Sequence, residues 1–129
     1  MTVIEVLDKS SIENLYAPLS YPARRVIYIG RDAKETEREC RVYRALFAAR
    51  GMQTVVESVI VTPGSGRELE TLTAVFDASD RYLIDLAGGD EVLLFLLGRA
   101  VEQVKPPFAL VHYGSAPAHR FLPVGMHSM

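Results

Sequence analysis

The chain has 129 residues, a single cysteine and a formal net charge of -2. A chain of this length fits one domain, and one cysteine cannot form an intramolecular disulfide, which favours a reducing, cytoplasmic compartment. The small negative charge creates no field that would gather duplex nucleic acid. The longest apolar run, Val92 to Leu97, is far shorter than the roughly 20 residues that span a bilayer, so we expect neither a membrane partner nor a duplex nucleic acid partner.

Strand-like segments alternate with helix-like segments along most of the chain. Several of the strand-like segments are apolar at consecutive positions, as in VIYI and FALV, and a strand that helices cover on both faces must be apolar on both faces. The alternation therefore predicts an α/β fold over residues 1–114, a Rossmann-like three-layer αβα domain with a mainly parallel sheet in the order 3-2-1-4-5. The predicted strands are Thr2–Leu7, Arg25–Ile29, Thr54–Val61, Tyr82–Asp85 and Phe108–Tyr113.

The first predicted helix follows the first strand. Ser10 and Glu13 have the spacing of a capping box, and Pro18 is expected to bend or shorten the helix. Apolar residues at helical spacing predict the buried stripe of this helix, which consists of Ile12, Leu15, Tyr16 and Leu19.

The next two predicted helices have recognisable ends. The second covers Ala33 to Arg50, with Asp32 at cap spacing from Glu35 and with Gly51 as a left-handed stop. The third is predicted to start at Ser65, after a turn-forming Pro-Gly pair.

The fourth predicted helix, Gly89 to Lys105, is apolar around its whole circumference at six consecutive positions. One sheet face cannot bury such a helix, so we expect it to form a homodimer interface, and a close approach of two helices would explain Gly98. The alternative is a monomer in which this helix is deeply packed. The predicted interface residues are Leu93, Leu94, Leu97 and Val101.

The tail, residues 115–129, mixes turn residues with one short apolar stretch. It is expected to add an edge strand, to lead as a linker to a domain not present in the sequence, or to be loose. The residue pattern leaves these three alternatives open.

A ligand site is expected beyond the carboxyl ends of the strands, where ligands bind in open parallel sheets. In the order 3-2-1-4-5 the loops after the first and fourth strands meet. In the segment IDLAGGDE the free amides of Ala87, Gly88, Gly89 and Asp90 would face a phosphate or another anion. The alternative is a tight turn in which Asp90 and Glu91 stabilise their own helix and repel an anion. The candidate ligand-binding residues are Ser10, Ser11, Gly30, Arg31, Asp32, Ala87, Gly88, Gly89 and Asp90.

Other candidates for chemistry are weaker. Lys34 lies near the same rim as Arg31, and Asp8 at a strand end is either an acid or base or, more commonly, a cap. No serine has the context of a nucleophile elbow, so no catalytic residue is predicted. The three histidines, His112, His119 and His127, show no metal-ligand pattern with Cys40, and we predict neither a metal site nor a cofactor.

The order of SIENLYAPL, RVIYIG, a charged helix and YLIDLAGGDEVLLFLLG resembles the amino-terminal CARF domain, the CRISPR-associated Rossmann fold, of cyclic-oligoadenylate-activated nucleases. The likeness covers about residues 3 to 113, and its two specific parts are the Ile-Glu-Asn-Leu helix start and the Asp-x-x-Gly-Gly turn. The resemblance implies a homodimer whose switch-point loops close around a cyclic adenylate ring in CRISPR-linked antiviral defence. Any cutting activity would belong to a longer parent chain with a restriction-endonuclease-like domain.

Two positions depart from that family's pattern: Ala87 stands where threonine is common, and Glu91 stands where many members have a basic residue. The leading hypothesis is a homodimeric regulatory domain that senses a nucleotide second messenger. The alternatives are a small nucleotide-acting enzyme, such as a ring nuclease with Asp8 as base, and a purely structural dimerisation module.

Overall fold

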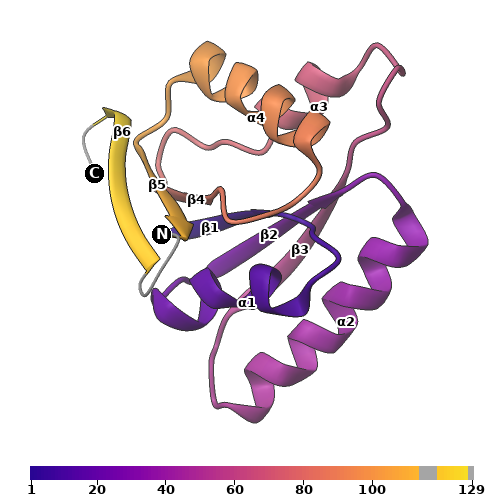
Figure 1. Ribbon diagram of the computed structural model, residues 1–129, viewed down its shortest axis with the longest axis vertical. Helices are drawn as coiled ribbons and strands as arrows, with labels where there is room; N and C mark the ends of the chain where they lie inside the picture. The colour runs from indigo at the N-terminus through magenta and orange to yellow at the C-terminus, as the bar shows by residue number, and fades with distance from the viewer. Residues whose placement is uncertain (114–118, 128–129) are drawn as a thin grey trace.

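The computed structural model describes residues 1–113 and 119–127, with side chains described through residue 111. It contains a six-stranded sheet in the order β3-β2-β1-β4-β5-β6, in which the first five strands are parallel. This arrangement confirms the predicted α/β fold and the strand order 3-2-1-4-5 (Figure 1). The strands are β1 (Thr2–Val6), β2 (Arg25–Gly30), β3 (Val55–Ile60), β4 (Tyr82–Asp85), β5 (Phe108–Tyr113) and β6 (His119–His127).

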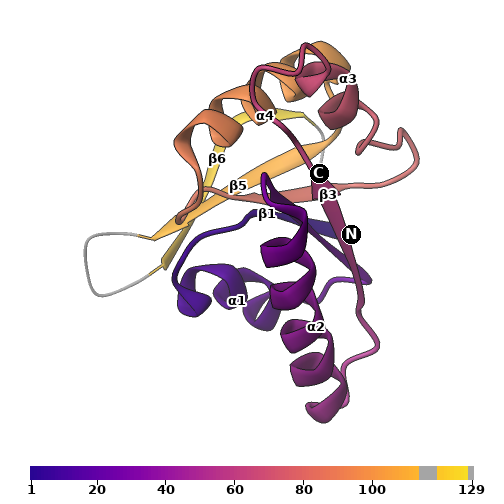
Figure 2. The ribbon, with the colours of Figure 1, turned by 90° about the vertical axis from the view of Figure 1, so that its right-hand side faces the viewer.

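Helices cover both faces of the sheet, as Figures 1 and 2 show. On one face α1 (Ser11–Ser20) and α2 (Ala33–Ala49) pack over strand residues such as Val3, Val26 and Leu83. On the other face α3 (Glu68–Thr73) and α4 (Glu91–Val104) pack over strand residues such as Ile4 and Ile27. Successive strand residues thus alternate between two separate cores, which requires strands that are apolar on both faces.

Helix α1 buries a different face from the predicted one. Ile12 is 73% exposed and Leu19 is 39% exposed, whereas Asn14, Ala17 and Pro18 are buried. The predicted apolar stripe is therefore wrong at its two ends. Ala17 packs in the core beneath α1, and Pro18 is accommodated inside the helix.

The buried amide of Asn14 explains the orientation of α1. Its Nδ2 donates to the carbonyl of Asp8 at 2.8 Å and to the hydroxyl of Tyr43 at 2.9 Å, and its Oδ1 accepts from the amide of Asp8 at 2.7 Å. The hydroxyl of Tyr28 donates to the carbonyl of Asn14 at 2.8 Å. Ser10 is the N-cap residue, but its side chain makes no capping hydrogen bond, so the predicted capping box does not form.

The second helix follows the prediction, and the third differs at its start. The carboxylate of Asp32 accepts from the amide of Glu35 at 2.8 Å, and Gly51 has a φ of 73°, the left-handed conformation expected after the helix. Helix α3 begins after Arg67 and not at Ser65, because the Ser65 hydroxyl accepts from the amide of Arg67 in a local turn.

Helix α4 is packed from two sides within the chain. Its inner face lies on the sheet, and α3 packs against its flank. Leu93, Leu97 and Val101, three of the residues predicted for the homodimer interface, are buried in this core, and Leu94 is half-buried against it. The apolar residues that α4 exposes are instead Val92, Phe95 and Val104. The predicted interface residues are thus corrected: an exposed interface on this helix has to use other side chains.

The chain beyond β5 adds β6, which pairs antiparallel with β5 at the edge of the sheet. An edge strand is one of the three alternatives that the sequence leaves open for the tail; residues 114–118 and 128–129 lie outside the described residues. Across residues 1–113 and 119–127, no helix has the length and apolar character that crossing a membrane requires.

Candidate functional site

The loops after β1 and β4 meet at the carboxyl edge of the sheet. The two strands are paired neighbours, with Glu5 opposite Asp85. Beyond them, the Oδ1 of Asp8 accepts from the amide of Gly89 at 2.9 Å. The predicted convergence of these two loops is therefore confirmed.

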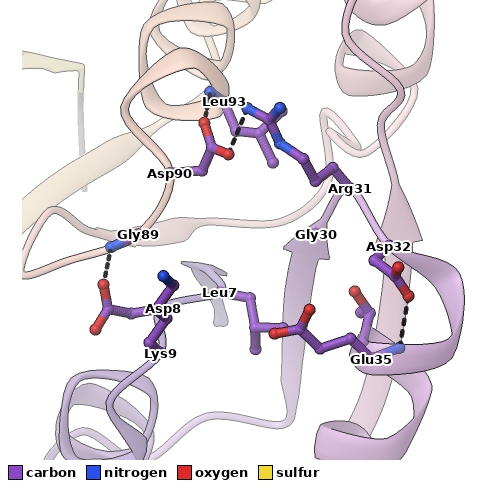
Figure 3. Close-up of a pocket in the computed structure, with 11 residues that line it drawn as sticks. Leu7, Asp8, Lys9, Gly30, Arg31, Asp32, Glu35, Gly89, Asp90 and Leu93 are labelled. Carbon is purple, nitrogen blue, oxygen red and sulfur yellow. Dashed lines mark hydrogen bonds and ion pairs between the residues drawn. The ribbon is translucent and has the colours of Figure 1, made fainter.

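A pocket of about 340 Å³ opens beside this junction, at the carboxyl ends of β1 and β2 and at the start of α2 and α4. Figure 3 shows its lining side chains, which lie within residues 7–9, 30–36 and 89–93. This is the position where open parallel sheets bind ligands. The pocket is lined by Leu7, Asp8, Lys9, Gly30, Arg31, Asp32, Glu35, Thr36, Gly89, Asp90 and Leu93.

An ion pair spans the pocket. Arg31, from the β2–α2 connection, reaches across to Asp90 at the start of α4, and the Nη2 to Oδ2 distance is 2.5 Å (Figure 3). The Arg31 side chain is 47% exposed and that of Asp90 is 26% exposed, so the pair contributes little to stability but can be opened by a competing anion. The complete lining holds more carboxylates than cations: Asp8, Asp32, Glu35 and Asp90 against Lys9 and Arg31.

The glycine pair of the β4–α4 turn packs against the chain itself. Gly89 has a φ of 102°, and a β-carbon there would lie 2.5 Å from the carbonyl oxygen of Val6. A β-carbon on Gly88 would lie 3.0 Å from the Cγ of Asp8 and 3.2 Å from the Cβ of Glu13. Glycine is therefore required at position 89 for the turn to lie on β1, and Gly88 packs closely against Asp8 and the start of α1.

The amides predicted to face an anion are partly occupied. The amide of Ala87 donates to Asp85 at 2.7 Å, and the amide of Gly89 donates to Asp8. Asp90 caps α4 by accepting from the amides of Val92 and Leu93 at 2.9 Å and 3.2 Å. The prediction of free amides is wrong for Ala87 and Gly89, because carboxylates of the chain accept their hydrogen bonds.

The wall formed by α2 contains a close contact between Gly30 and Thr36. A β-carbon on Gly30 would lie 2.1 Å from the Oγ1 of Thr36, so only glycine leaves room for this hydroxyl. Thr36 is 1% exposed, and its hydroxyl has no hydrogen-bond partner among the described residues. The contact brings the first turn of α2 down onto the end of β2.

The predicted ligand-binding residues divide into two groups. Gly30, Arg31, Asp32, Gly89 and Asp90 line the pocket, whereas Ser10, Ser11, Ala87 and Gly88 do not. Ser10 and Ser11 are exposed at the start of α1. Sequence reasoning missed Leu7, Lys9, Glu35, Thr36 and Leu93 as lining residues. The one sequence feature that could have indicated these lining residues is their position, directly after β1 or within the first turn of a helix that follows a strand.

A cluster of carboxyl groups lies on the α1 side of the same junction. Glu5 and Asp85 are each 2% exposed and occupy opposite positions of β1 and β4. Burial raises the pKa of Glu5 well above its ordinary value, and the neighbouring Asp85 and Glu13 carboxyls raise that pKa further. Burial also raises the pKa of Glu13, with Asp8 and Asp85 adding to the effect. Sequence reasoning missed this cluster because Glu5 lies inside an otherwise apolar strand.

No set of three or more His, Cys, Asp or Glu side chains that could hold a metal ion occurs in the described part of the chain. The side chains of His112, His119 and His127 lie outside the described ones. Cys40 is buried against the sheet, and burial raises the pKa of its thiol to about 11.

Neither the models of known protein families nor the curated proteins include one that matches this chain. The fold and the site define its class: a Rossmann-like α/β domain with a pocket, lined by several charged side chains, at the carboxyl edge of a parallel sheet.

Proposed function

We propose that this chain is a ligand-sensing regulatory domain that binds a nucleotide second messenger at a homodimer interface. The observation that carries the proposal is the pocket at the carboxyl ends of β1 and β2, bridged by the ion pair of Arg31 and Asp90. Cyclic oligoadenylate, in CRISPR-linked antiviral defence, is the messenger that the resemblance to the CARF family implies.

The chemistry of the lining supports a nucleoside ligand. Carboxylates such as Asp8 and Glu35 accept hydrogen bonds from ribose hydroxyls and from the amino group of adenine. Lys9 and Arg31 supply the positive charge that a phosphodiester needs. An excess of carboxylates disfavours a bare polyphosphate, so the ligand that fits carries few phosphates and many hydrogen-bond donors.

The size of the pocket supports a ligand shared by two protomers. Small-molecule pockets usually span roughly 300 to 1,000 Å³, and a cavity of about 340 Å³ accommodates one nucleoside-sized part of a ligand. A cyclic oligonucleotide is larger, and a two-fold symmetric dimer would present two such pockets to one ring.

The exposed face of α4 supports a dimer. Phe95 is 68% exposed and Val92 is 50% exposed, and they lie three residues apart on one face of the helix. Gly98 continues this exposed surface, and a β-carbon there would meet no atom within 4 Å. A mid-helix glycine costs about 1 kcal/mol relative to alanine, and nothing in the described part of the chain requires it. Close approach of a second helix accounts for both the glycine and the exposed Phe95.

The Arg31–Asp90 pair offers a route from the ligand to that interface. A phosphodiester that binds Arg31 competes with Asp90, which is also the N-cap of α4. When Arg31 releases Asp90, the conformation of this N-cap residue changes. The change acts on the start of α4, the helix that carries Val92 and Phe95. Ligand binding thereby shifts the pairing of the protomers.

Calorimetric titration with cyclic tetra-adenylate and cyclic hexa-adenylate, followed by chromatography of the mixture, tests the proposal. Binding without turnover supports a sensor. Linear products would support the nucleotide-acting enzyme, although the Asp8 carboxylate already accepts from the amides of Ser10 and Gly89. Absence of heat together with a persistent dimer would support the structural module.

Two pairs of variants sharpen the test. Arg31→Ala should weaken binding by at least about tenfold, the effect of losing one charge-assisted contact, whereas Arg38→Ala, an exposed cation outside the pocket lining, should not. Phe95→Glu should yield monomers in sedimentation experiments, whereas Val42→Glu, at a position 57% exposed on α2, should leave the dimer intact.

A further inference from the structure

A pair of buried acidic side chains lies beneath the β4–α4 turn and takes no part in the pocket lining. Glu5 and Asp85 lie opposite each other in the register of β1 and β4, and their side chains point to the face that α1 and α2 cover. One oxygen of each, Oε2 of Glu5 and Oδ2 of Asp85, is buried and accepts no hydrogen bond from the described residues. Two ionised carboxylates in this position would repel each other without compensation.

Among the residues that the structure describes, the groups that act on Glu5 are negative and none is a basic side chain. Glu13 faces it from α1, and Asp8 faces Glu13 from the loop before that helix. Tyr28 is the register partner of Glu5 on β2, and its hydroxyl donates to the backbone of α1. From β5, Val111 pairs with Asp85 and is apolar. Besides burial, the carboxyl groups of Asp85 and Glu13 raise the pKa of Glu5, while Glu5 in turn raises the pKa of Tyr28 and Asp85 that of Tyr21.

We propose that Glu5 and Asp85 share one proton in the folded chain, and that release of this proton loosens the β4–α4 turn that borders the pocket. In the protonated pair, the Glu5 carboxyl donates an O–H to the Asp85 carboxylate. On release, the O–H bond breaks, the proton goes to water, and the pair acquires a second negative charge.

The connections of Asp85 explain why the turn responds. Asp85 is the last residue of β4, and its Oδ1 holds the amide of Ala87. The turn is held again two residues later, where Asp8 accepts from the amide of Gly89. Repulsion is relieved most readily by moving Asp85, because a strand end can move without breaking the sheet. Its movement removes the bond to Ala87, so the middle of the turn is held only at its flanks, where the amide of Leu86 donates to the carbonyl of Val111 at 2.7 Å and the amide of Gly89 donates to Asp8.

The direction of titration agrees with this geometry, since the pKa of Glu5 is raised, chiefly by burial and next by Asp85. The shared proton belongs to the fold and does not depend on which ligand fills the pocket. A failure of nucleotide binding would therefore not argue against the shared proton. The absence of a shared proton would likewise not argue against nucleotide binding.

Infrared spectroscopy of the full chain tests the proposal without any ligand. At neutral pH the wild type should show the carbonyl stretch of a protonated carboxyl group, and Glu5→Gln should lack it. Glu57→Gln, the same change at a 45% exposed glutamate on β3, should retain the band. In the wild type, the protection of the Ala87 amide from hydrogen exchange, measured relative to its intrinsic rate at each pH, should fall over the pH range in which the band disappears.

Three results would overturn the proposal: a wild type with no protonated carboxyl band at neutral pH, a band that persists in a folded Glu5→Gln, or exchange at Ala87 that does not follow the loss of the band. If Glu5→Gln does not fold, a carbon-13 titration of the Glu5 carboxyl in the wild type decides the question. An ordinary pKa at that carboxyl would refute the shared proton.

Discussion

The β4–α4 turn and the helix that follows it contain glycine for opposite reasons. In the turn, the space that a Gly89 side chain would occupy is filled by Val6 of the same chain. On α4, the space beside Gly98 is empty. A glycine packed against its own chain requires no ligand to explain it, whereas the chain itself offers no packing reason for a helical glycine that faces open space. We therefore expect the ligand to contact the Arg31 side of the pocket and not the glycine pair.

The largest expected effect on stability concerns Gly89, the glycine that packs against Val6 of its own chain. Gly89→Ala should lower the free energy of unfolding by about 3 kcal/mol or more, because it combines a positive φ with a contact of 2.5 Å to the carbonyl of Val6. Urea denaturation measures the change. A loss below about 1 kcal/mol would mean that the turn does not lie on β1 as described.

The next effect concerns the other packed glycine. Gly30→Ala should destabilise the chain by about 2 kcal/mol, since its β-carbon would overlap the Thr36 hydroxyl. Combining it with Thr36→Ala should recover part of that loss, which a double-mutant cycle from denaturation curves measures. Additive effects of the two substitutions would contradict the contact.

A pH-dependent effect of intermediate size is expected at the buried carboxyl pair. The pKa of Glu5 is higher in the folded than in the unfolded chain, so its stabilising contribution is complete below the unfolded pKa. That contribution is lost as the pH rises through the folded pKa, with a slope of about 1.4 kcal/mol per pH unit for one proton. Glu5→Gln should remove this slope in denaturation curves recorded across pH, and Glu57→Gln should not. An equal slope in the wild type and in Glu5→Gln would exclude Glu5 as its source.

The smallest effect on stability concerns Gly98, the glycine that faces open space on α4. Gly98→Ala should raise the free energy of unfolding of the protomer by at most about 1 kcal/mol, because alanine is the better helix former and no atom obstructs its side chain. In sedimentation equilibrium the same change should weaken the dimer if two helices approach closely at this position. An unchanged dimer would show that Gly98 does not lie in the interface.

Much of the fold could be predicted from local patterns. Strands apolar on both faces, the cap formed by Asp32 on Glu35 and the left-handed Gly51 all follow from short-range physical rules, and the structure bears them out. The strand order in turn placed the loops after β1 and β4 together.

The remaining features depend on contacts that are distant in sequence. The inner face of α1 is set by Asn14, whose partners include Tyr43 on another helix, so apolar periodicity alone indicated the wrong side. The occupied amide of Gly89 depends on Asp8, which is 81 positions away. The burial of Leu93 and Leu97 depends on α3 as well as the sheet, because α3 covers the flank of α4. No local pattern reports such pairings.

The most direct test of the proposal that this pocket binds a nucleotide is to map amide chemical shifts by NMR while cyclic tetra-adenylate or cyclic hexa-adenylate is added. The largest shifts are expected at Gly30, Arg31 and Asp90, around the ion pair that spans the pocket. Shifts confined to the other end of the strands, around Arg24 and Asp80, would contradict a nucleotide site at this position. The absence of shifts with either ring would contradict it as well.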